Sequence, residues 1–78
     1  PAAWTMHGDH QLKVYRTRSV KGRQPGIPGV VTVTDTSLMV AAQDGHLEVL
    51  ELQQEGRRRM TAMEFLRGYS LTTGDRWS

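Results

Sequence analysis

Three consecutive arginines, Arg57, Arg58 and Arg59, stand between a glycine turn at Gly56 and the start of a short helical pattern. Guanidinium groups form charge-assisted hydrogen bonds to phosphate oxygens, and clustered cations are the electrostatic footprint of nucleic-acid binding. The positive end of a helix dipole disfavours cations, so three of them at this place accept a small penalty that phosphate would offset. The alternative is a solvated turn whose charges keep a β-edge from aggregating. The residues alone leave both interpretations open.

The charges are segregated along the chain, although the net charge is only +2. Residues 1–23 contain five cations and one acid, residues 24–56 contain five acids and no Lys or Arg, and the remainder contains five arginines and two acids. Fields act locally, over a Debye length of about 10 Å, so this segregation matters more than the total. If the first and last thirds meet, we expect one basic face, with the acidic middle facing elsewhere. The cations that would join the three arginines on that face are Lys13, Arg16, Arg18, Lys21 and Arg23.

Other residue types that could perform chemistry do not assemble into a recognised pattern. His7 and His10 look like a metal pair, but metal sites need three or four ligands, and only His46 and scattered carboxylates could complete the set. A polar hairpin turn is the favoured interpretation. The sequence has no nucleophile elbow, Walker-type loop or Rossmann glycine pattern. We therefore expect no catalytic residue and no metal in this chain.

Aromatic side chains are few for a barrel that binds single strands, where adjacent strands usually present several stacking platforms. Trp4 and Phe65 are expected in the core. Tyr15 lies between Lys13 and Arg16 in the sequence and is the one candidate for a contact to a base or sugar. Core packing is its slightly favoured alternative.

Short apolar runs separated by turn residues predict the elements that must position these side chains. We expect strands at 3–7, 12–18, 30–34, 38–42 and 47–53, and a helix at 61–67. Asp44-Gly45 is a hairpin signal, and Thr61 and Glu64 have the spacing of a capping box. Residues 19–29 contain three Gly and two Pro and are expected to form a loop. Residues 69–78 are expected to form a tail, anchored by Leu71 and Trp77.

This pattern predicts a mainly β fold: a small open antiparallel Greek-key barrel, OB-like, with one short α-helix near the C-terminus. The strand at 47–53 breaks the alternation, because Leu47 and Val49 face one way and Leu50 and Leu52 the other. Either a bulge shifts the register or both faces are covered. Seventy-eight residues predict one domain, 1–78, and the start at Pro1 without Met suggests part of a longer enzyme. With no cysteine and no apolar run near 20 residues, we expect a soluble protein of the cytoplasm.

Several ordered segments closely resemble the C-terminal domain family of formyltransferases, as found in methionyl-tRNA formyltransferases. The resemblance covers nearly the whole chain, about residues 1–76, and its most specific part is Leu52–Met60 followed by the capped helix. Single positions in these segments are commonplace, whereas the ordered set is not. The segments that carry the resemblance are 1–5, 12–15, 28–31, 44–60 and 64–68.

The resemblance implies a barrel that follows a Rossmann-like catalytic domain, which binds formyltetrahydrofolate. Catalysis in the family uses an Asn–His–Asp set in that other domain, and this chain contains no asparagine. The implied partners are therefore the N-terminal catalytic domain and initiator methionyl-tRNA, whose acceptor arm the barrel holds with a basic surface. Lys13 and residues 57–59 occupy matching motifs, whereas Arg16, Arg18, Lys21 and Arg23 are inferred from charge clustering alone.

The same module accompanies formyltransferases that act on sugar nucleotides, and also formyltetrahydrofolate hydrolases. The alternative function is therefore a structural or oligomerisation module beside such an enzyme. That alternative predicts an apolar patch on one face of the barrel and indifference to RNA.

Overall fold

The computed structural model describes residues 2–22 and 26–78, so the candidate residue Arg23 lies outside the described residues. Within these ranges the sheet has the spatial order β1-β2-β5-β4-β3, with β6 paired to β5, and all pairings are antiparallel. Strands β3, β4 and β5 follow one another directly, and β2 lies beside β5, which is a Greek-key connection. The expected fold class is confirmed. The elements are β1 (Ala3–His7), β2 (His10–Val20), β3 (Val31–Val33), β4 (Leu38–Ala42), β5 (Gly45–Gln54), β6 (Met60–Thr61) and α1 (Ala62–Gly68).

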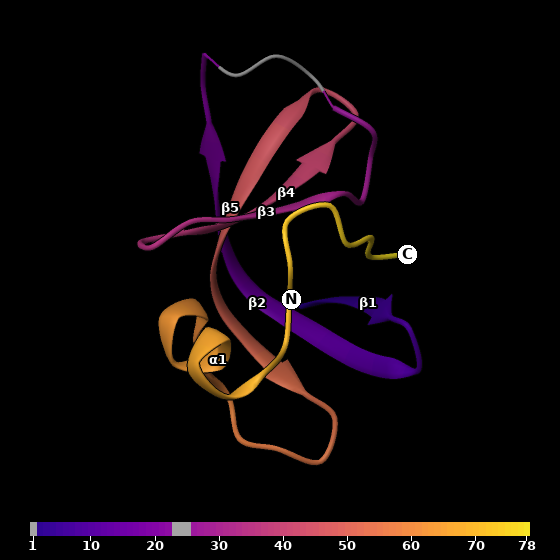
Figure 1. Ribbon diagram of the computed structural model, residues 1–78, viewed down its shortest axis with the longest axis vertical. Coiled ribbons are helices and arrows are strands. Elements are labelled where there is room, and N and C mark those ends of the chain that lie inside the picture. Colours follow the sequence, from indigo (N-terminus) through magenta and orange to yellow (C-terminus); the bar gives the residue numbers. More distant parts are fainter. Residues whose placement is uncertain (1, 23–25) are drawn as a thin grey trace.

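The sheet curls into an open half-barrel around a small apolar core, with β2 and β5 as its long strands (Figure 1). Fully burying a Leu or Val side chain stabilises a fold by roughly 1.5–3 kcal/mol, so the core contributes much of the stability. Phe65 of α1 and Trp77 of the tail are buried with it, as expected, and Leu71 packs against it. The largest fully buried side chains are Leu12, Val31, Leu38, Val49 and Leu52.

Several of the expected strand boundaries are wrong, because β2 runs over His10–Val20, β3 over Val31–Val33 and β5 over Gly45–Gln54. Two of the differences result from pairing partners far away in the sequence. Strand β2 continues through Ser19 and Val20, which pair with Leu47 and His46 of β5, so the expected loop begins only after them. Strand β3 is shorter than expected at its start, because Val30 forms an isolated bridge with Arg76 of the tail. The hairpin before β5 is also displaced by one residue from Asp44-Gly45, since position 42 pairs with position 45.

The broken alternation of β5 results from two register irregularities that cancel each other. Tyr15 is the additional residue in β2 and Leu50 is the additional residue in β5, and the register is the same on either side of them. The additional residue allows Val49 and Leu52, three positions apart, both to face the core. Of the two expected explanations, the bulge is therefore the correct one.

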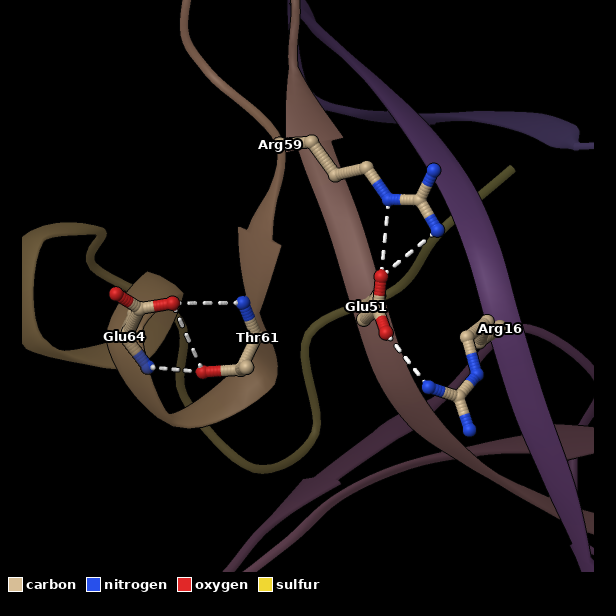
Figure 2. A network of polar contacts seen from close by, with 5 residues as sticks. All are labelled: Arg16, Glu51, Arg59, Thr61 and Glu64. Atoms are coloured by element: carbon tan, nitrogen blue, oxygen red, sulfur yellow. Dashed lines mark hydrogen bonds and ion pairs between the residues drawn. The ribbon is translucent and has the colours of Figure 1, made fainter.

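Helix α1 begins at a capping box, as its sequence predicts. The Glu64 amide donates to Thr61 Oγ1 at 3.2 Å, and the Thr61 amide donates to Glu64 Oε1 at 3.0 Å (Figure 2). Hydrogen bonds donated to the Glu64 carboxylate, first by the Thr61 amide and next by the Arg58 side chain, hold the pKa of Glu64 below its usual value. The helix has seven residues, and no helix in the described ranges has the length and apolar character needed to cross a membrane.

The C-terminal tail covers both edges of the sheet. In Figure 1 the yellow segment leaves α1 and runs back across the molecule toward β3 and β1. The Val31 amide of β3 donates to the Asp75 carbonyl at 2.8 Å, and Met6 of β1 exchanges two backbone hydrogen bonds with Ser78. The Trp77 amide donates to the Gly29 carbonyl at 2.7 Å. Because unpaired edge strands invite association with other chains, the tail protects the edges that the half-barrel leaves open.

Candidate nucleic-acid interface

Strand β2 presents a row of cations on the outer face of the sheet. Lys13, Arg16 and Arg18 all belong to β2, and Arg16 and Arg18 lie directly opposite Glu51 and Glu48 of β5. The additional residue Tyr15 keeps Lys13 and Arg16 on the same face, although alternation alone would separate them.

Glu51 binds two of the arginines at once. Its Oε2 accepts from Arg16 Nη1 at 2.7 Å, and its Oε1 accepts from Arg59 Nε at 2.9 Å and from Nη2 at 2.8 Å. Figure 2 shows the carboxylate between the two guanidinium groups, one from β2 and one from the segment before β6. Hydrogen bonds from Arg16 and then Arg59 hold the pKa of Glu51 below its usual value. The carboxylate therefore stays ionised and joins the first and last thirds of the chain.

The expectation that the acidic middle faces away from the cations is wrong for Glu48 and Glu51. Antiparallel pairing of β2 with β5 places these acids opposite arginines, and Arg18 also forms an ion pair with Glu48. Arg58 contacts Glu64 at 3.3 Å. Exposed ion pairs of this kind are worth about 0–1 kcal/mol each, so they can open toward a phosphate at little cost. The paired arginine side chains are 49–70% exposed.

The remaining candidate cations divide into two groups. Arg57 adjoins the row, and within the described part of the chain neither it nor Lys13 of the row has a carboxylate within ion-pair distance. The Arg57 carbonyl accepts from Gln53 Nε2 at 2.7 Å, which fixes the turn against β5. Lys21 follows the far end of β2, beside the turn at residues 43–45, and is not brought to the row. We define the basic surface as Lys13, Arg16, Arg18, Arg57, Arg58 and Arg59.

Two aromatic side chains lie beside the basic surface, and the expected core position of Trp4 is wrong. Trp4 is 56% exposed, because it pairs with Lys13 on the outer face of the first hairpin. Tyr15 is only partly buried, and its hydroxyl donates to Gln53 Oε1 at 2.7 Å. Lys13 Nζ lies 4.9 Å from the Trp4 ring centroid and 5.3 Å from that of Tyr15. Arg59 Cζ lies 4.1 Å from the centroid of Tyr15. We call Trp4, Lys13, Tyr15 and Arg59 the Trp4 cluster.

A second polar cluster, which the sequence did not reveal, lies on the opposite face of β1. His7 Nε2 lies 3.0 Å from Asp75 Oδ2, and His7 Nδ1 lies 2.6 Å from the Tyr69 hydroxyl. Because an ionised carboxylate only accepts, Nε2 donates to Asp75, and in the neutral ring Nδ1 accepts from the hydroxyl. The Thr72 amide and then His7 hold the pKa of Asp75 below its usual value, whereas burial raises the pKa of Tyr69. We call His7, Tyr69 and Asp75 the His7 cluster.

The turn at residues 8–9 joins β1 to β2, so the hairpin expected around the first two histidines is confirmed. Across the described ranges, no group of three His, Asp or Glu side chains is arranged to hold a metal ion.

The comparison with known families decides the relationship of the chain. Residues 1–70 match the family described as formyl transferase, C-terminal domain. The chain belongs to this family. The expected resemblance is therefore confirmed, and the half-barrel of this formyl transferase C-terminal domain carries the basic surface described above.

Curated relatives of this domain include methionyl-tRNA formyltransferases from several bacteria. The one from Syntrophus aciditrophicus is 37% identical over 75 residues, and the one from Solibacter usitatus is 40% identical over 76 residues. These alignments cover 95% and 97% of this chain, but 24% of each relative. The protein from Acidobacterium capsulatum is 42% identical over 72 residues, covering 91% of this chain and 23% of its own length. The chain thus spans about a quarter of the length of these relatives.

Proposed function

We propose that this chain is the RNA-holding domain of a methionyl-tRNA formyltransferase, and that its basic surface binds the acceptor arm of initiator methionyl-tRNA. The observation that carries the proposal is the row of cations on β2 together with the adjoining turn at residues 57–59. Six cations there outnumber the acids that contact them, Glu48, Glu51 and Glu64. The relatives that carry the name methionyl-tRNA formyltransferase support this assignment.

The role of the basic surface follows from the chemistry of its side chains. Lys and Arg neutralise phosphates and fix the register of a duplex, and they carry little information about base identity. Arg16 and Arg59 are each paired with Glu51, and a phosphate can replace this carboxylate as their partner at little cost. The surface therefore positions a substrate and does not react with it.

Formyl transfer belongs, in this proposal, to an N-terminal Rossmann-like domain. That domain would supply the Asn–His–Asp set and bind formyltetrahydrofolate, which is the cofactor expected for an enzyme of this family. This chain has no asparagine with which to contribute to such a set.

The salt dependence of RNA binding tests the proposal. On a duplex, the log–log slope of affinity against salt is about −0.9 for each phosphate neutralised. Lys13 and Arg57 can each neutralise one phosphate, so an acceptor-stem RNA should give a log–log slope of about −2. The slope should be steeper if the paired arginines exchange their carboxylates for phosphates. Binding that ignores salt, or no binding at low salt, would overturn the assignment.

A charge reversal separates binding from folding. Arg57→Glu should weaken binding of the acceptor stem by about tenfold at low salt and make the slope shallower by about 0.9. The thermal midpoint should not fall, because the exposed Arg57 side chain makes no ion pair within the described residues. Arg67→Glu is the matched control, because it makes the same charge change in the last turn of α1, beside residues 33–36. Equal weakening by both variants would point to a non-specific charge effect.

Removing an acid instead of a cation tests the role of the ion pairs. Glu51→Gln removes the carboxylate that holds Arg16 and Arg59, so both guanidinium groups become free for phosphate. We expect tighter binding of the same RNA, by roughly threefold to tenfold at low salt, and a steeper slope. Weaker binding would mean that Glu51 is needed to position the arginines.

A second candidate function is a structural or oligomerisation module beside a formyltransferase that acts on a small molecule. A hollow of about 320 Å³ on the half-barrel favours it, because most of its lining is apolar and includes Val14, Val40, Leu47 and Trp77. This function requires indifference to RNA, so the same salt titration distinguishes the two candidates.

A further inference from the structure

The exposure of Trp4 is the observation that the phosphate-binding proposal leaves unexplained. At 56% exposed, its indole is one of three large apolar side chains left open to solvent in the described chain, with Met6 and Ile27. Burying apolar surface is worth about 25 cal/mol per Å², so a binding partner that covered the indole would gain substantially. Trp4 lies on the regular strand β1 and pairs with Lys13. Its position is thus set by the sheet.

The surroundings of Trp4 indicate which kind of partner fits. Lys13 Nζ lies between the rings of Trp4 and Tyr15, and Arg59 covers Tyr15. Aromatic faces combined with cations that track a backbone are the arrangement by which proteins bind unpaired nucleotides. The π-face of any base can stack on an indole, while a neighbouring ammonium binds the phosphate.

The hollow beside the indole favours a base over a second phosphate. It is lined by Trp4, Lys13, Gln53, Glu55 and Gly56, and has a volume of about 150 Å³. The carboxylate of Glu55 in this lining repels phosphate, but it can accept hydrogen bonds from the amino groups of bases. Gln53 is held in place by bonds to the Tyr15 hydroxyl and the Arg57 carbonyl, so the hollow is built before a ligand binds.

We propose that the Trp4 cluster stacks one unpaired nucleotide of the bound RNA, with the base on the indole of Trp4 and the adjacent phosphate at Lys13. This inference rests on the proposed RNA-binding function. It adds that the domain distinguishes a duplex with a single-stranded end from a blunt duplex by stacking a base. An uncharged apolar protein segment would leave Lys13 without a partner of opposite charge among the described residues.

The test compares two RNAs that share one stem, of which one is blunt and the other carries a single-stranded 3′ end. The unmodified chain should bind the second RNA more tightly. Trp4→Ala should weaken that binding by roughly fivefold to a hundredfold, since one stacked base is worth about 1–3 kcal/mol. Binding of the blunt stem, its salt slope and the thermal midpoint should stay unchanged. Trp4→Phe should restore most of the preference.

Each other outcome is decisive. If the blunt stem binds with the expected salt slope but the chain shows no preference for the single-stranded end, the stacking inference is overturned and the phosphate-binding function stands. The stacking inference also fails if Trp4→Ala keeps the preference, or if it weakens both RNAs equally. If neither RNA binds at low salt, both proposals fail, and Trp4 is left as a surface for another protein segment.

Discussion

The two faces of strand β1 carry two clusters of aromatic and polar side chains. The clusters differ in how many of their hydrogen-bonding and charged groups have partners within the described chain. On the inner side, His7 uses both ring nitrogens within the chain, on Asp75 and on the Tyr69 hydroxyl. On the outer side, Trp4 is 56% exposed and touches a lysine whose ammonium has no carboxylate partner among the described residues. The same strand thus has one face closed by the chain itself and one face left open.

This difference separates structure from binding. The His7 cluster joins β1 to the tail, in which Tyr69 and Asp75 lie 62 and 68 positions further along the chain than His7, so its bonds hold the fold together. The Trp4 cluster joins neighbours in one sheet that backbone pairing already holds. Its side chains add little to the fold and keep capacity for a ligand. Substitutions in the first cluster should therefore change stability, and substitutions in the second should change affinity.

The largest expected effect comes from disturbing the tail, which carries Asp75 of the His7 cluster, at its contact with Gly29. This residue has φ +90°, and a Cβ there would overlap the Trp77 carbonyl. Gly29→Ala should lower the free energy of unfolding by about 2–4 kcal/mol, because a left-handed conformation alone costs about 1–2 kcal/mol and the tail must also move. Urea denaturation measures the loss. RNA affinity of the folded fraction should not change.

Gly68→Ala provides the matched control for that variant. Gly68 ends α1 without positive φ, and beyond its own neighbours no atom lies within 4 Å of the position that an alanine methyl group would take. Alanine there should leave stability unchanged or raise it by about 0.4–1 kcal/mol, because it reduces the entropy of the unfolded chain. Equal destabilisation by both substitutions would mean that the approach of the tail to Gly29 is unimportant.

A smaller effect is expected at His7 itself. His7→Phe keeps the ring but leaves the Tyr69 hydroxyl and the Asp75 carboxylate without this partner. The free energy of unfolding should fall by about 1–3 kcal/mol. His10→Phe is the control, because His10 is exposed and, among the described residues, has one side-chain hydrogen bond, to Gln54 at 3.3 Å, and an edge-on ring contact with Tyr69. That change should stay within about 0.5 kcal/mol. A large loss at His10, or none at His7, would contradict the comparison.

Local sequence patterns predicted the features that depend on residues close together. The capping box needs only Thr61 and Glu64, three positions apart, and the first hairpin needs only its turn at residues 8–9. The outward position of Trp4 could also have been predicted. A two-residue turn fixes Trp4 opposite Lys13, and Lys13 faces outward because it follows the buried Leu12. The general tendency of tryptophan to be buried was given too much weight.

Long-range pairing could not be predicted in the same way. The pairing of Glu51 with Arg16 depends on the register between β2 and β5, and that register contains two additional residues. The broken alternation of β5 indicated a bulge in that strand, but no local signal revealed the compensating one in β2. The His7 cluster depends on where the tail crosses the sheet edges, which backbone hydrogen bonds to Val31 and Met6 decide. Charge segregation along the chain thus indicated a basic surface. The acids that pair with its arginines, however, were wrongly expected to face elsewhere.

The smallest expected effect is a difference in how two carboxylates respond to acid and salt: Glu51, which pairs with Arg59 of the Trp4 cluster, and Asp75 of the His7 cluster. The pKa values of Glu51 and Asp75 are both lowered in the folded chain, so each carboxylate contributes stability that is present above its ordinary pKa, 4.5 or 3.8, and is lost as the pH falls through the lowered value. Arginines are the main cause at Glu51, whereas a backbone amide, that of Thr72, is the main cause at Asp75.

Salt should therefore weaken the contribution of Glu51 to stability more than that of Asp75, because ion pairs at an exposed surface are screened and a fixed backbone hydrogen bond is not. The measurement is the urea midpoint near pH 6 and near pH 3, in low salt and in about 1 M salt. Glu51→Gln should reduce the pH dependence of the midpoint in low salt and have little further effect in high salt. Asp75→Asn should reduce it in both. If the two variants respond alike to salt, the exposed ion pairs of Glu51 and the backbone-anchored carboxylate of the His7 cluster do not differ in the way that their contacts imply.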